Sequence, residues 1–344
     1  METLLHIGVA GCGYWGPNLA RNFRSLEACR VPVVCDTNPE RLRHLRSLYP
    51  EMAGCTDYAE FLNYEPLEAV AIATPVRHHY WMAKAALEKG KHTLIEKPMA
   101  SSLAECQELL ALARRQGVML MVGHTFLYAP AVRRMKEILA GGEVGDIRYI
   151  CSRRLNLGLF QNDINVTWDL APHDLSIILH LVGEPPQSVA CSGAAHVNPG
   201  VEDVAMLFLK FSGGRCAIVH NSWLEPRKVR EMTIVGSRKM IVYDDVEPHE
   251  KLKIYDKRVE PMPHYDTFAD FHYAYHYGEN YAPYVRQEEP LKLECQHFAE
   301  CIRSGCQPLT DGQHGAEIVA ILEAAQTSLA RHGQAVPCGT IAPA

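Results

Sequence analysis

The chain has 344 residues, which is too long for one ordinary hydrophobic core, so two domains are expected. Hydrophobic residues make up 47% of the chain and charged residues 22%, a composition typical of globular proteins. The net charge of −6 gives no electrostatic reason to expect nucleic acid or an anionic membrane as a partner, and no apolar run approaches the roughly 20 residues that span a bilayer.

Short apolar strands alternate with helices over residues 1–125. The predicted strands cover 6–10, 31–36, 69–74, 93–96 and 118–123, and the predicted helices cover 17–26, 39–49, 79–89 and 102–116. Continuous apolar strands separated by helices indicate a parallel sheet with helices on both faces. The sequence therefore predicts a doubly wound α/β domain over 1–125, of the kind that binds dinucleotides.

The pattern changes after residue 125, where strands follow one another with short turns. The predicted strands cover 147–155, 188–196, 203–211, 216–223, 230–235, 240–243 and 252–255, and the predicted helices cover 131–140, 170–182, 294–303 and 315–330. This spacing predicts a second α/β domain over 126–344 with an open, mostly antiparallel sheet and C-terminal helices within about 294–330. Residues 264–284 are rich in Tyr and His and give no structural prediction.

A glycine fingerprint, Gly11-Cys12-Gly13-Tyr14-Trp15-Gly16, follows the first strand and opens the first helix. Gly11 permits the tight turn, Gly13 permits backbone approach to a pyrophosphate, and Gly16 permits close packing of helix on strand. Phosphate oxygens would meet the free N–H groups at the helix start. The alternative is an ordinary glycine-rich turn, which the strand-turn-helix context disfavours.

Asp36 ends the second strand, twenty residues after Gly16, where a carboxylate can accept both hydroxyls of a ribose. It would repel a 2′-phosphate, and no basic residue follows at once in Thr37-Asn38-Pro39. NAD is therefore favoured over NADP. The alternative is a surface aspartate with no role in binding.

Two further strands end in residues suited to a cofactor site. Thr74-Pro75 and then His79 follow the third strand, and Glu96-Lys97-Pro98 follows the fourth. Ligands bind at this edge of doubly wound sheets, so we expect Lys97 beside the nicotinamide, as a general acid or base. The alternatives are a solvated histidine at 79 and a lysine at 97 whose amine lies in water.

Asp169 and His173 lie four residues apart, on one face of the predicted helix. A carboxylate that orients an imidazole is suited to removing a proton from an alcohol. Asp174 is nearby, but no cysteine or glutamate completes a metal-ligand set, so no metal is expected. The alternative is that Asp169 caps the helix and His173 packs in the core.

These motifs together resemble the glucose–fructose oxidoreductase / inositol dehydrogenase / MocA (Gfo/Idh/MocA) family over essentially the whole chain. The resemblance implies an N-terminal Rossmann domain, a C-terminal sheet that commonly forms an oligomer interface, and a catalytic pair of Lys97 and His173 beside Asp169. The residues expected to contact the cofactor are Gly11, Gly13, Tyr14, Trp15, Gly16, Asp36, Thr74, Pro75, His79, Glu96 and Lys97.

A narrower resemblance, to nucleotide-sugar 3-dehydrogenases of the UDP-N-acetylglucosamine type, rests on the stretches 123–128, 154–158 and 165–174. It implies substrate contacts at Tyr128, Arg154, Asn156, Asn165, Asp169 and His173. Arg154 would suit a bidentate contact with a diphosphate. The implied activity is oxidation of the sugar C3 hydroxyl to a ketone by an NAD(P)-dependent oxidoreductase.

Several alternatives stay open at this point. Either Lys97 or His173 could accept the hydroxyl proton, and the substrate could instead be an inositol, a free sugar or a sugar phosphate. An NAD-dependent glycosidase and a non-catalytic NAD or sugar sensor are rival functions. We expect a homo-oligomer, dimer or tetramer, without nucleic-acid or membrane partners.

A cytoplasmic location is expected from two features of the sequence. The N-terminal residues 1–6 start a strand and lack the regions of a signal peptide. The twelve cysteines include no C-x-x-C pair, and many fall within apolar or regular segments, as thiols in a reducing compartment do.

Overall fold

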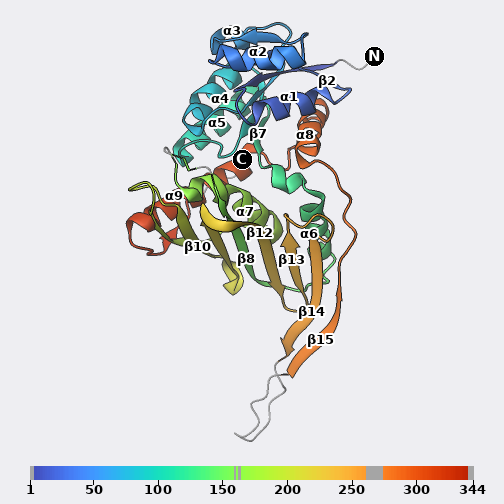
Figure 1. The fold of residues 1–344 in the computed structure, drawn as a ribbon, viewed down its shortest axis with the longest axis vertical. Helices are drawn as coiled ribbons and strands as arrows, with labels where there is room; N and C mark the ends of the chain where they lie inside the picture. The colour runs from blue at the N-terminus through green and yellow to red at the C-terminus, as the bar shows by residue number, and fades with distance from the viewer. Residues whose placement is uncertain (1–3, 159, 162–163, 261–273, 340–344) are drawn as a thin grey trace, which may run out of the picture. The chain divides into compact units, whose positions relative to one another are not determined.

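The computed structural model describes residues 4–158, 160–161, 164–260 and 274–339 (Figure 1). The chain divides into two compact units, of which the first comprises Met1–Ala129, Glu288–Glu323 and Gly339–Ala344. The second comprises Pro130–Gln287 and Ala324–Cys338.

This division differs from the predicted boundary at residue 125 because the chain returns to the first unit after residue 287. The returning helix α8 (Pro290–Ser304) buries Cys295 and Phe298 in the first unit's core. An amphipathic pattern shows that a helix has a buried face, but it does not show which core receives that face.

The first unit is built on a parallel sheet in the strand order β4-β3-β1-β5-β6-β7, with β2 also pairing with β1. The strands are β1 (Leu5–Ala10), β2 (Cys29–Arg30), β3 (Val33–Cys35), β4 (Ala53–Cys55), β5 (Ala69–Ile72), β6 (His92–Glu96) and β7 (Leu120–Gly123). The predicted doubly wound sheet is confirmed. Its order reverses at β1, which has β3 on one side and β5 on the other, so the carboxyl ends of β1 and β5 flank the usual ligand crevice.

Helices lie on both faces of this sheet (Figure 1). They are α1 (Gly16–Arg24), α2 (Pro39–Leu48), α3 (Tyr58–Leu62), α4 (His79–Glu88), α5 (Leu103–Gln116), α8 and the first part of α9 (Gly312–Ala330), with single 3-10 turns at Val76–His78 and Thr125–Tyr128. Phe23 of α1 meets Phe298 of α8 edge-on, with ring centroids 6.1 Å apart. Helices α1, α2 and α8 share one buried cluster with β1, which fixes the strand ends that carry the site.

The second unit is built on a nine-stranded sheet in the order β15-β14-β13-β12-β8-β11-β10-β9-β16. The strands are β8 (Ile147–Leu157), β9 (Ser188–Ala194), β10 (Val204–Lys210), β11 (Cys216–Ser222), β12 (Leu224–Gly236), β13 (Met240–Asp244), β14 (Leu252–Glu260), β15 (Ala274–Tyr281) and β16 (Val336–Pro337). Among the described strands of this second sheet, only β8 and β11 pair in parallel, so the predicted mostly antiparallel sheet is confirmed.

Strand β15 falls within the segment 264–284, for which no structure was predicted. Most of its side chains are exposed, so it lacks the alternation of buried and exposed residues that identifies a strand. Residues 264–273 lie outside the described part of the chain.

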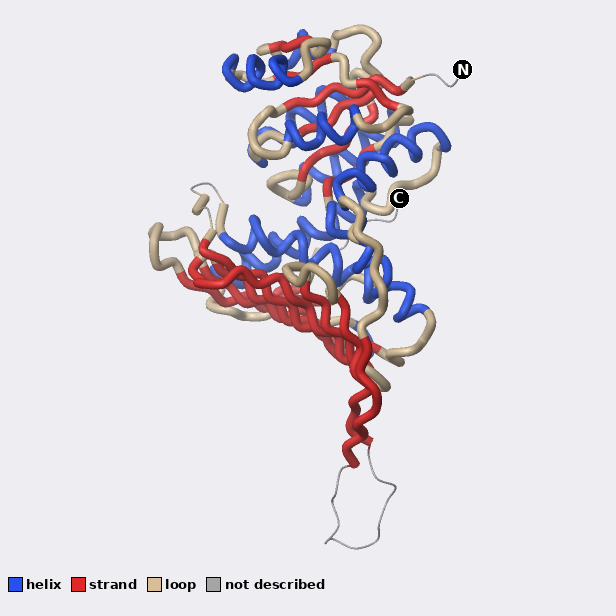
Figure 2. The backbone as a smooth tube through the Cα atoms, turned by 45° about the vertical axis from the view of Figure 1, so that its right-hand side comes forward, coloured by secondary structure: helices blue, strands red, loops and turns tan. Residues whose placement is uncertain are grey.

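The helices of the second unit lie along one face of its sheet (Figure 2). They are α6 (Pro130–Ala140), α7 (Val166–Val182) and the last part of α9, with a 3-10 turn at Ser212–Gly214. Along β10, Leu207 and Leu209 are buried, whereas Met206 and Phe208 are 52% and 38% exposed. The face opposite the helices therefore presents apolar side chains to solvent. Over the described residues of both units, no helix combines the length and apolar character needed to cross a membrane.

Candidate active site

The turn after β1 has no space for a side chain at two of its glycines. Gly11 has a φ of +91°, and a Cβ there would lie 2.6 Å from the carbonyl oxygen of Ala73. A Cβ on Gly16 would lie 1.8 Å from the carbonyl oxygen of Gly11, so the first residue of α1 packs directly on the turn. At Gly13 the nearest described atom to the Cβ position, in Arg41, is 4.0 Å away. The backbone at Gly13 is therefore open to a ligand, as a pyrophosphate contact requires.

Asp36 follows β3 and is 7% exposed. Its carboxylate accepts hydrogen bonds from the backbone N–H of Cys12 at 2.6 Å and of Asn38 at 2.8 Å. The glycine turn itself thus orients the carboxylate that is predicted to bind the ribose.

Arg41 is a site residue that the sequence reasoning missed. Its Nη1 lies 3.4 Å from Asp36, because α2 brings it back toward the end of β3. The three residues that directly follow Asp36, Thr37-Asn38-Pro39, include no basic side chain. A basic residue in the first turn of the helix that follows the acidic residue would have been the signal.

A cavity of about 930 Å³ lies in the first unit, large enough for a cofactor. Its lining includes seven of the residues predicted to contact the cofactor: Gly11, Gly13, Tyr14, Trp15, Asp36, Thr74 and Pro75. Arg41, Tyr58, Trp81 and Met82 complete much of the wall. An open glycine backbone, a preoriented carboxylate and a partly apolar wall fit the pyrophosphate, ribose and adenine of NAD.

His79 is buried, with 1% of its surface exposed, and the solvated histidine considered from the sequence is wrong. Its Nδ1 lies 2.8 Å from the carbonyl oxygen of Pro98 and its Nε2 lies 2.7 Å from that of Thr74. Burial lowers the pKa of His79. The ring therefore ties together the segments that follow β5 and β6, while its neighbour His78 lines the cavity. A direct contact of His79 with the cofactor stays a prediction.

Lys97 directly follows β6 and is half-buried. Its backbone N–H donates to Oε2 of Glu96 at 3.3 Å, and burial raises the pKa of Glu96 to about 7. The end of β6 thus carries a carboxyl group that can exchange a proton near neutral pH, next to the lysine in the sequence.

Helix α7 starts at Val166, so the predicted start at Leu170 is wrong. The side chain of Asn165 accepts from the backbone N–H of Trp168 at 3.2 Å and caps the helix one turn earlier than predicted. Asn165 also donates to Glu202 at 2.8 Å and to Gln326 at 2.9 Å. Its predicted role as a substrate contact would require it to release these partners.

Asp169 and His173 lie one helical turn apart on α7, both half-buried. Asp169 accepts a hydrogen bond from the indole N–H of Trp223 at 3.1 Å. The helix-capping role that the sequence left open for Asp169 belongs to Asn165 instead. Trp223 fixes the direction of the carboxylate, and the sequence reasoning missed it because it lies 54 residues away.

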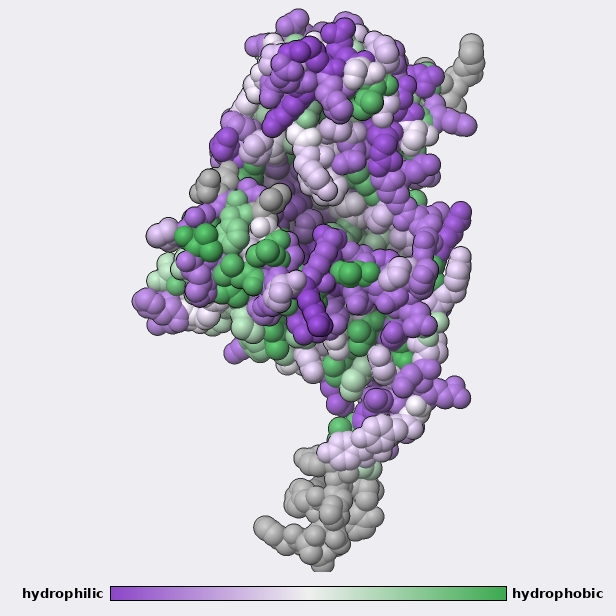
Figure 3. Space-filling view, in the orientation of Figure 1, coloured by the Kyte–Doolittle hydropathy of each residue, from purple (hydrophilic) through white to green (hydrophobic). Residues whose placement is uncertain are grey.

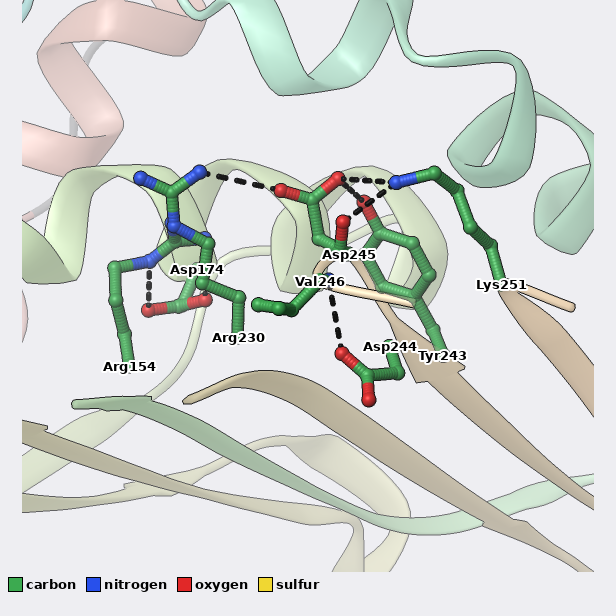
Figure 4. A network of polar contacts seen from close by, with 8 residues as sticks. All are labelled: Arg154, Asp174, Arg230, Tyr243, Asp244, Asp245, Val246 and Lys251. Carbon is green, nitrogen blue, oxygen red and sulfur yellow. Dashed lines mark hydrogen bonds and ion pairs between the residues drawn. The ribbon is translucent and has the colours of Figure 1, made fainter. Parts of the chain in front are cut away.

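Arg154, on β8, forms a buried ion pair with Asp174 (Figure 4). Its Nε and Nη2 donate to the two carboxylate oxygens at 2.9 and 3.0 Å. The bidentate geometry predicted for a diphosphate is therefore used within the protein. Figure 4 also shows Asp245 joining Arg230 and Lys251 in the same polar network.

The other two predicted substrate contacts lie in different settings. Asn156 is half-buried on β8, where a Cβ on Gly158 would come within 3.1 Å of its amide nitrogen. Tyr128 is fully buried in the first unit, and its hydroxyl lies 3.0 Å from that of Thr310. Contact with a sugar would require the Tyr128 side chain to leave this core position.

The predicted catalytic residues divide between the units, with Lys97 in the first and Asp169 and His173 in the second. Their meeting in one catalytic centre stays a prediction. Among the described residues, no group of three or more His, Cys, Asp and Glu side chains is placed to hold a metal ion.

Two family models match the chain. The model described as "Oxidoreductase family, NAD-binding Rossmann fold" covers residues 5–124, and that of the GFO/IDH/MocA C-terminal domain covers residues 132–242. The chain belongs to the GFO/IDH/MocA family. It is an oxidoreductase with a Rossmann domain that binds NAD, in agreement with the cavity described above.

Related proteins align with almost the full length of this family member. D-apiose dehydrogenase of Paraburkholderia graminis is 26% identical over 95% of this chain and 88% of its own. UDP-N-acetylglucosamine 3-dehydrogenase of Acidithiobacillus ferrooxidans is 26% identical over 92% of this chain and 94% of its own. A solved structure of the latter superposes with a TM-score of 0.82 at 24% identity, covering 96% of this chain and all of that one, which shows the shared fold.

Proposed function

We propose that the protein is an NAD-dependent sugar dehydrogenase that oxidises a pyranose hydroxyl to a ketone, at C3 of a nucleotide sugar such as UDP-N-acetylglucosamine. The position of Lys97 in the first unit carries this proposal. It directly follows β6, whose neighbour β5 leads into Thr74 and Pro75 of the cofactor cavity. An amine at this edge of a doubly wound sheet lies on the ligand-binding side.

The residues of the chain have distinct parts in the proposed reaction. Bound NAD supplies the acceptor for the hydride. Asp36 holds the adenosine ribose, and the open backbone at Gly13 receives the pyrophosphate. Either Lys97 or His173 removes the hydroxyl proton, while the other stabilises the oxygen as negative charge develops. Asp169, fixed by Trp223, orients the imidazole.

The nucleotide-sugar assignment is supported by the relative named for UDP-N-acetylglucosamine. It is also supported by the stretches 123–128, 154–158 and 165–174 of this chain, which resemble that branch. A second candidate is a free-sugar dehydrogenase, favoured by the equally similar D-apiose dehydrogenase. Because Arg154 donates to both carboxylate oxygens of Asp174, a diphosphate would have to bind to other residues or displace Asp174 from Arg154.

The test is a screen for NADH formation with UDP-sugars, free sugars, sugar phosphates and inositols. We expect turnover with a UDP-sugar, and Lys97→Met should lower kcat by about 10²–10⁴-fold with little change in the Kd for NAD. Glu108→Gln, an exposed change on α5, serves as the control. Sugar cleavage without net NADH would favour the glycosidase, and binding without turnover of any sugar would favour the sensor.

We also propose that the protein assembles as a dimer or tetramer through the open face of the second unit's sheet. Met206 and Phe208 are apolar and exposed there, and Figure 3 shows hydrophobic residues gathered on the side of this unit where β10 lies. Light scattering should give a mass above that of one chain, and Phe208→Asp should reduce it. A monomeric wild-type protein would contradict the assembly.

A cytoplasmic location is proposed as well. All twelve cysteines are free thiols, including three on neighbouring segments of the first unit, Cys12, Cys35 and Cys55. Thiols persist in reducing compartments. Cell fractionation of the tagged protein is the test, and recovery outside the cytoplasm would contradict the proposal.

A further inference from the structure

Two glutamates of the first unit, Glu96 beside Lys97 and Glu294, have carboxyl groups that interact electrostatically; Glu96 is half-buried and Glu294 is fully buried. Glu96 ends β6 and pairs with Gly123 at the end of β7. A Cβ at Gly123 would lie 3.1 Å from the carboxyl carbon of Glu96, so the carboxyl group packs directly on the glycine backbone. Glu294 on α8 is the second, with none of its surface exposed.

Several polar atoms in this region lack a hydrogen-bond partner among the described atoms. The Thr125 hydroxyl donates to Oε2 of Glu294 at 2.7 Å, but Oε1 has no such partner. His124 is 1% exposed, and both of its ring nitrogens also lack a hydrogen-bond partner among the described atoms. Buried polar atoms are normally hydrogen-bonded, so this region has hydrogen-bonding capacity that the described atoms do not use.

The protonation states follow from burial and charge. Burial raises the pKa of Glu96 to about 7. Burial, together with the charge of Glu96, raises the pKa of Glu294 well above its ordinary range. Burial, with the charges of His314 and Lys97, lowers the pKa of His124 well below its ordinary range. Burial thus favours the uncharged forms of Glu294 and His124, whereas the charge of Glu96 changes near neutral pH.

We propose that Glu96 receives the proton that Lys97 removes from the substrate hydroxyl, with Glu294 and His124 as buried polar groups near its carboxyl group. The inference rests on the proposed function, in the form in which Lys97 rather than His173 is the base. The sugar carbon gives up a hydride with its electron pair to bound NAD, and its hydroxyl gives up a proton to the amine. The resulting ammonium passes a proton to the Glu96 carboxylate, which later releases it to water.

The groups facing Glu96 come from each element packed around it. Lys97 at the end of β6 favours its ionised form. Glu294 on α8 is neutral, and so is His124 after β7, next to His314 of α9 with ring centroids 5.5 Å apart. A carboxylate with one cationic neighbour and neutral surroundings is suited to gain and lose a proton in each turnover.

The first test measures the Glu96 carboxyl directly. The NAD-bound protein, labelled with carboxyl-¹³C glutamate, is titrated by NMR, and the signal missing from Glu96→Gln identifies the residue. We expect a midpoint near pH 7 in wild type and no large change in Glu294→Gln, because Glu294 is already uncharged. A Glu96 carboxyl fully ionised at pH 5 would overturn the proposal.

The second test is the pH dependence of NADH formation. In wild type the rate should rise with pH around 7, as Glu96 ionises. Glu96→Gln should remove this limb and lower kcat by about tenfold or more, with the Kd for NAD within about twofold of wild type. The surface variant Glu108→Gln should behave as wild type. A Glu96→Gln variant that keeps the limb near pH 7 would refute the relay, since a merely structural glutamate would leave the profile unmoved.

The two proposals fail in different ways. If wild type forms no NADH from any sugar, the proposed function is wrong, and the carboxyl titration still decides whether Glu96 is a buried proton acceptor. If NADH forms normally but Glu96 titrates as an ordinary carboxylate, the proposed function stands and the relay is wrong.

Discussion

The two units hold their predicted functional residues in different ways. In the first unit these residues follow strand ends, and their partners are mostly backbone groups of neighbouring turns, as with Asp36 and the N–H of Cys12. In the second unit they lie on a long strand and a helix, and their partners are side chains from distant parts of the chain, as with Asn165 and Gln326. A site built on turns leaves a local sequence signature, whereas one built on side-chain pairs does not.

The largest expected effect concerns the buried pair of the second unit. Asp174→Ala should lower the free energy of unfolding by about 3–5 kcal/mol, because it leaves the Arg154 guanidinium buried without its carboxylate. The matched control is the ion pair of the adjacent β8 residue, Arg153, with Glu231, which is partly exposed. Glu231→Ala should cost only about 0–1 kcal/mol. Urea denaturation measures both free energies of unfolding. Equal losses in Asp174→Ala and Glu231→Ala would show that the buried Arg154 pair stabilises the fold no more than the exposed Arg153 pair.

This pair also shows where sequence reasoning stopped. Arg154 was assigned to a diphosphate because its guanidinium suits bidentate contacts, and the structure uses that geometry for Asp174, twenty positions along the chain. Nothing in the local pattern distinguishes the two partners. By contrast, the roles of Gly11 and Gly16 were predictable because the steric limits of the turn are local.

The same contrast applies to the folds. Both sheets were predicted from short apolar segments and from the helices or turns between them, yet β15 was missed because its side chains are mostly exposed. The start of α7 was misplaced because Asn165 was assigned to the substrate although it also has the chemistry of a helix cap. Local patterns specify the elements, and tertiary contacts decide which of two suitable roles a residue takes.

In the first unit, the pH dependence of stability should report the ionisation of the half-buried Glu96. Its pKa of about 7 in the folded protein exceeds that of an unfolded glutamate, so its contribution is present below about pH 4.3 and is lost as pH rises through 7. Relative to Glu96→Gln, wild type should lose on the order of 3 kcal/mol across this window. Chemical denaturation of both proteins at several pH values measures the difference, and a constant difference would contradict the assignment.

The turn-based cofactor site predicts a change in specificity. Asp36→Asn should weaken NAD binding by about 1–3 kcal/mol, since it removes a charged acceptor from the ribose. It should also improve the ratio of NADP to NAD binding, because Arg41 then faces a 2′-phosphate without the opposing carboxylate. Calorimetric titration with both cofactors measures this, with Asp36→Asn/Arg41→Ala as the control that should lose the gain. An unchanged ratio in Asp36→Asn would rule out a role for Arg41.

The smallest expected effect compares one helix cap in each unit. Asn38 caps α2 through a single bond to the N–H of Glu40, whereas Asn165 caps α7 and also donates to Glu202 and Gln326. Asn38→Ala should cost about 1 kcal/mol and Asn165→Ala about 2 kcal/mol in thermal or urea unfolding. An equal loss of unfolding free energy in Asn38→Ala and Asn165→Ala would show that the bonds of Asn165 to Glu202 and Gln326 add no stability.

The most direct test of the proposed function follows the hydrogen at C3 of the sugar. The protein is incubated with NAD and UDP-N-acetylglucosamine carrying deuterium at C3, and the nucleotide and sugar products are analysed by mass spectrometry. The account predicts deuterium in the reduced nicotinamide, a 3-keto nucleotide sugar, and loss of both products in Lys97→Met. Reduced cofactor without deuterium, or products unchanged in Lys97→Met, would contradict it.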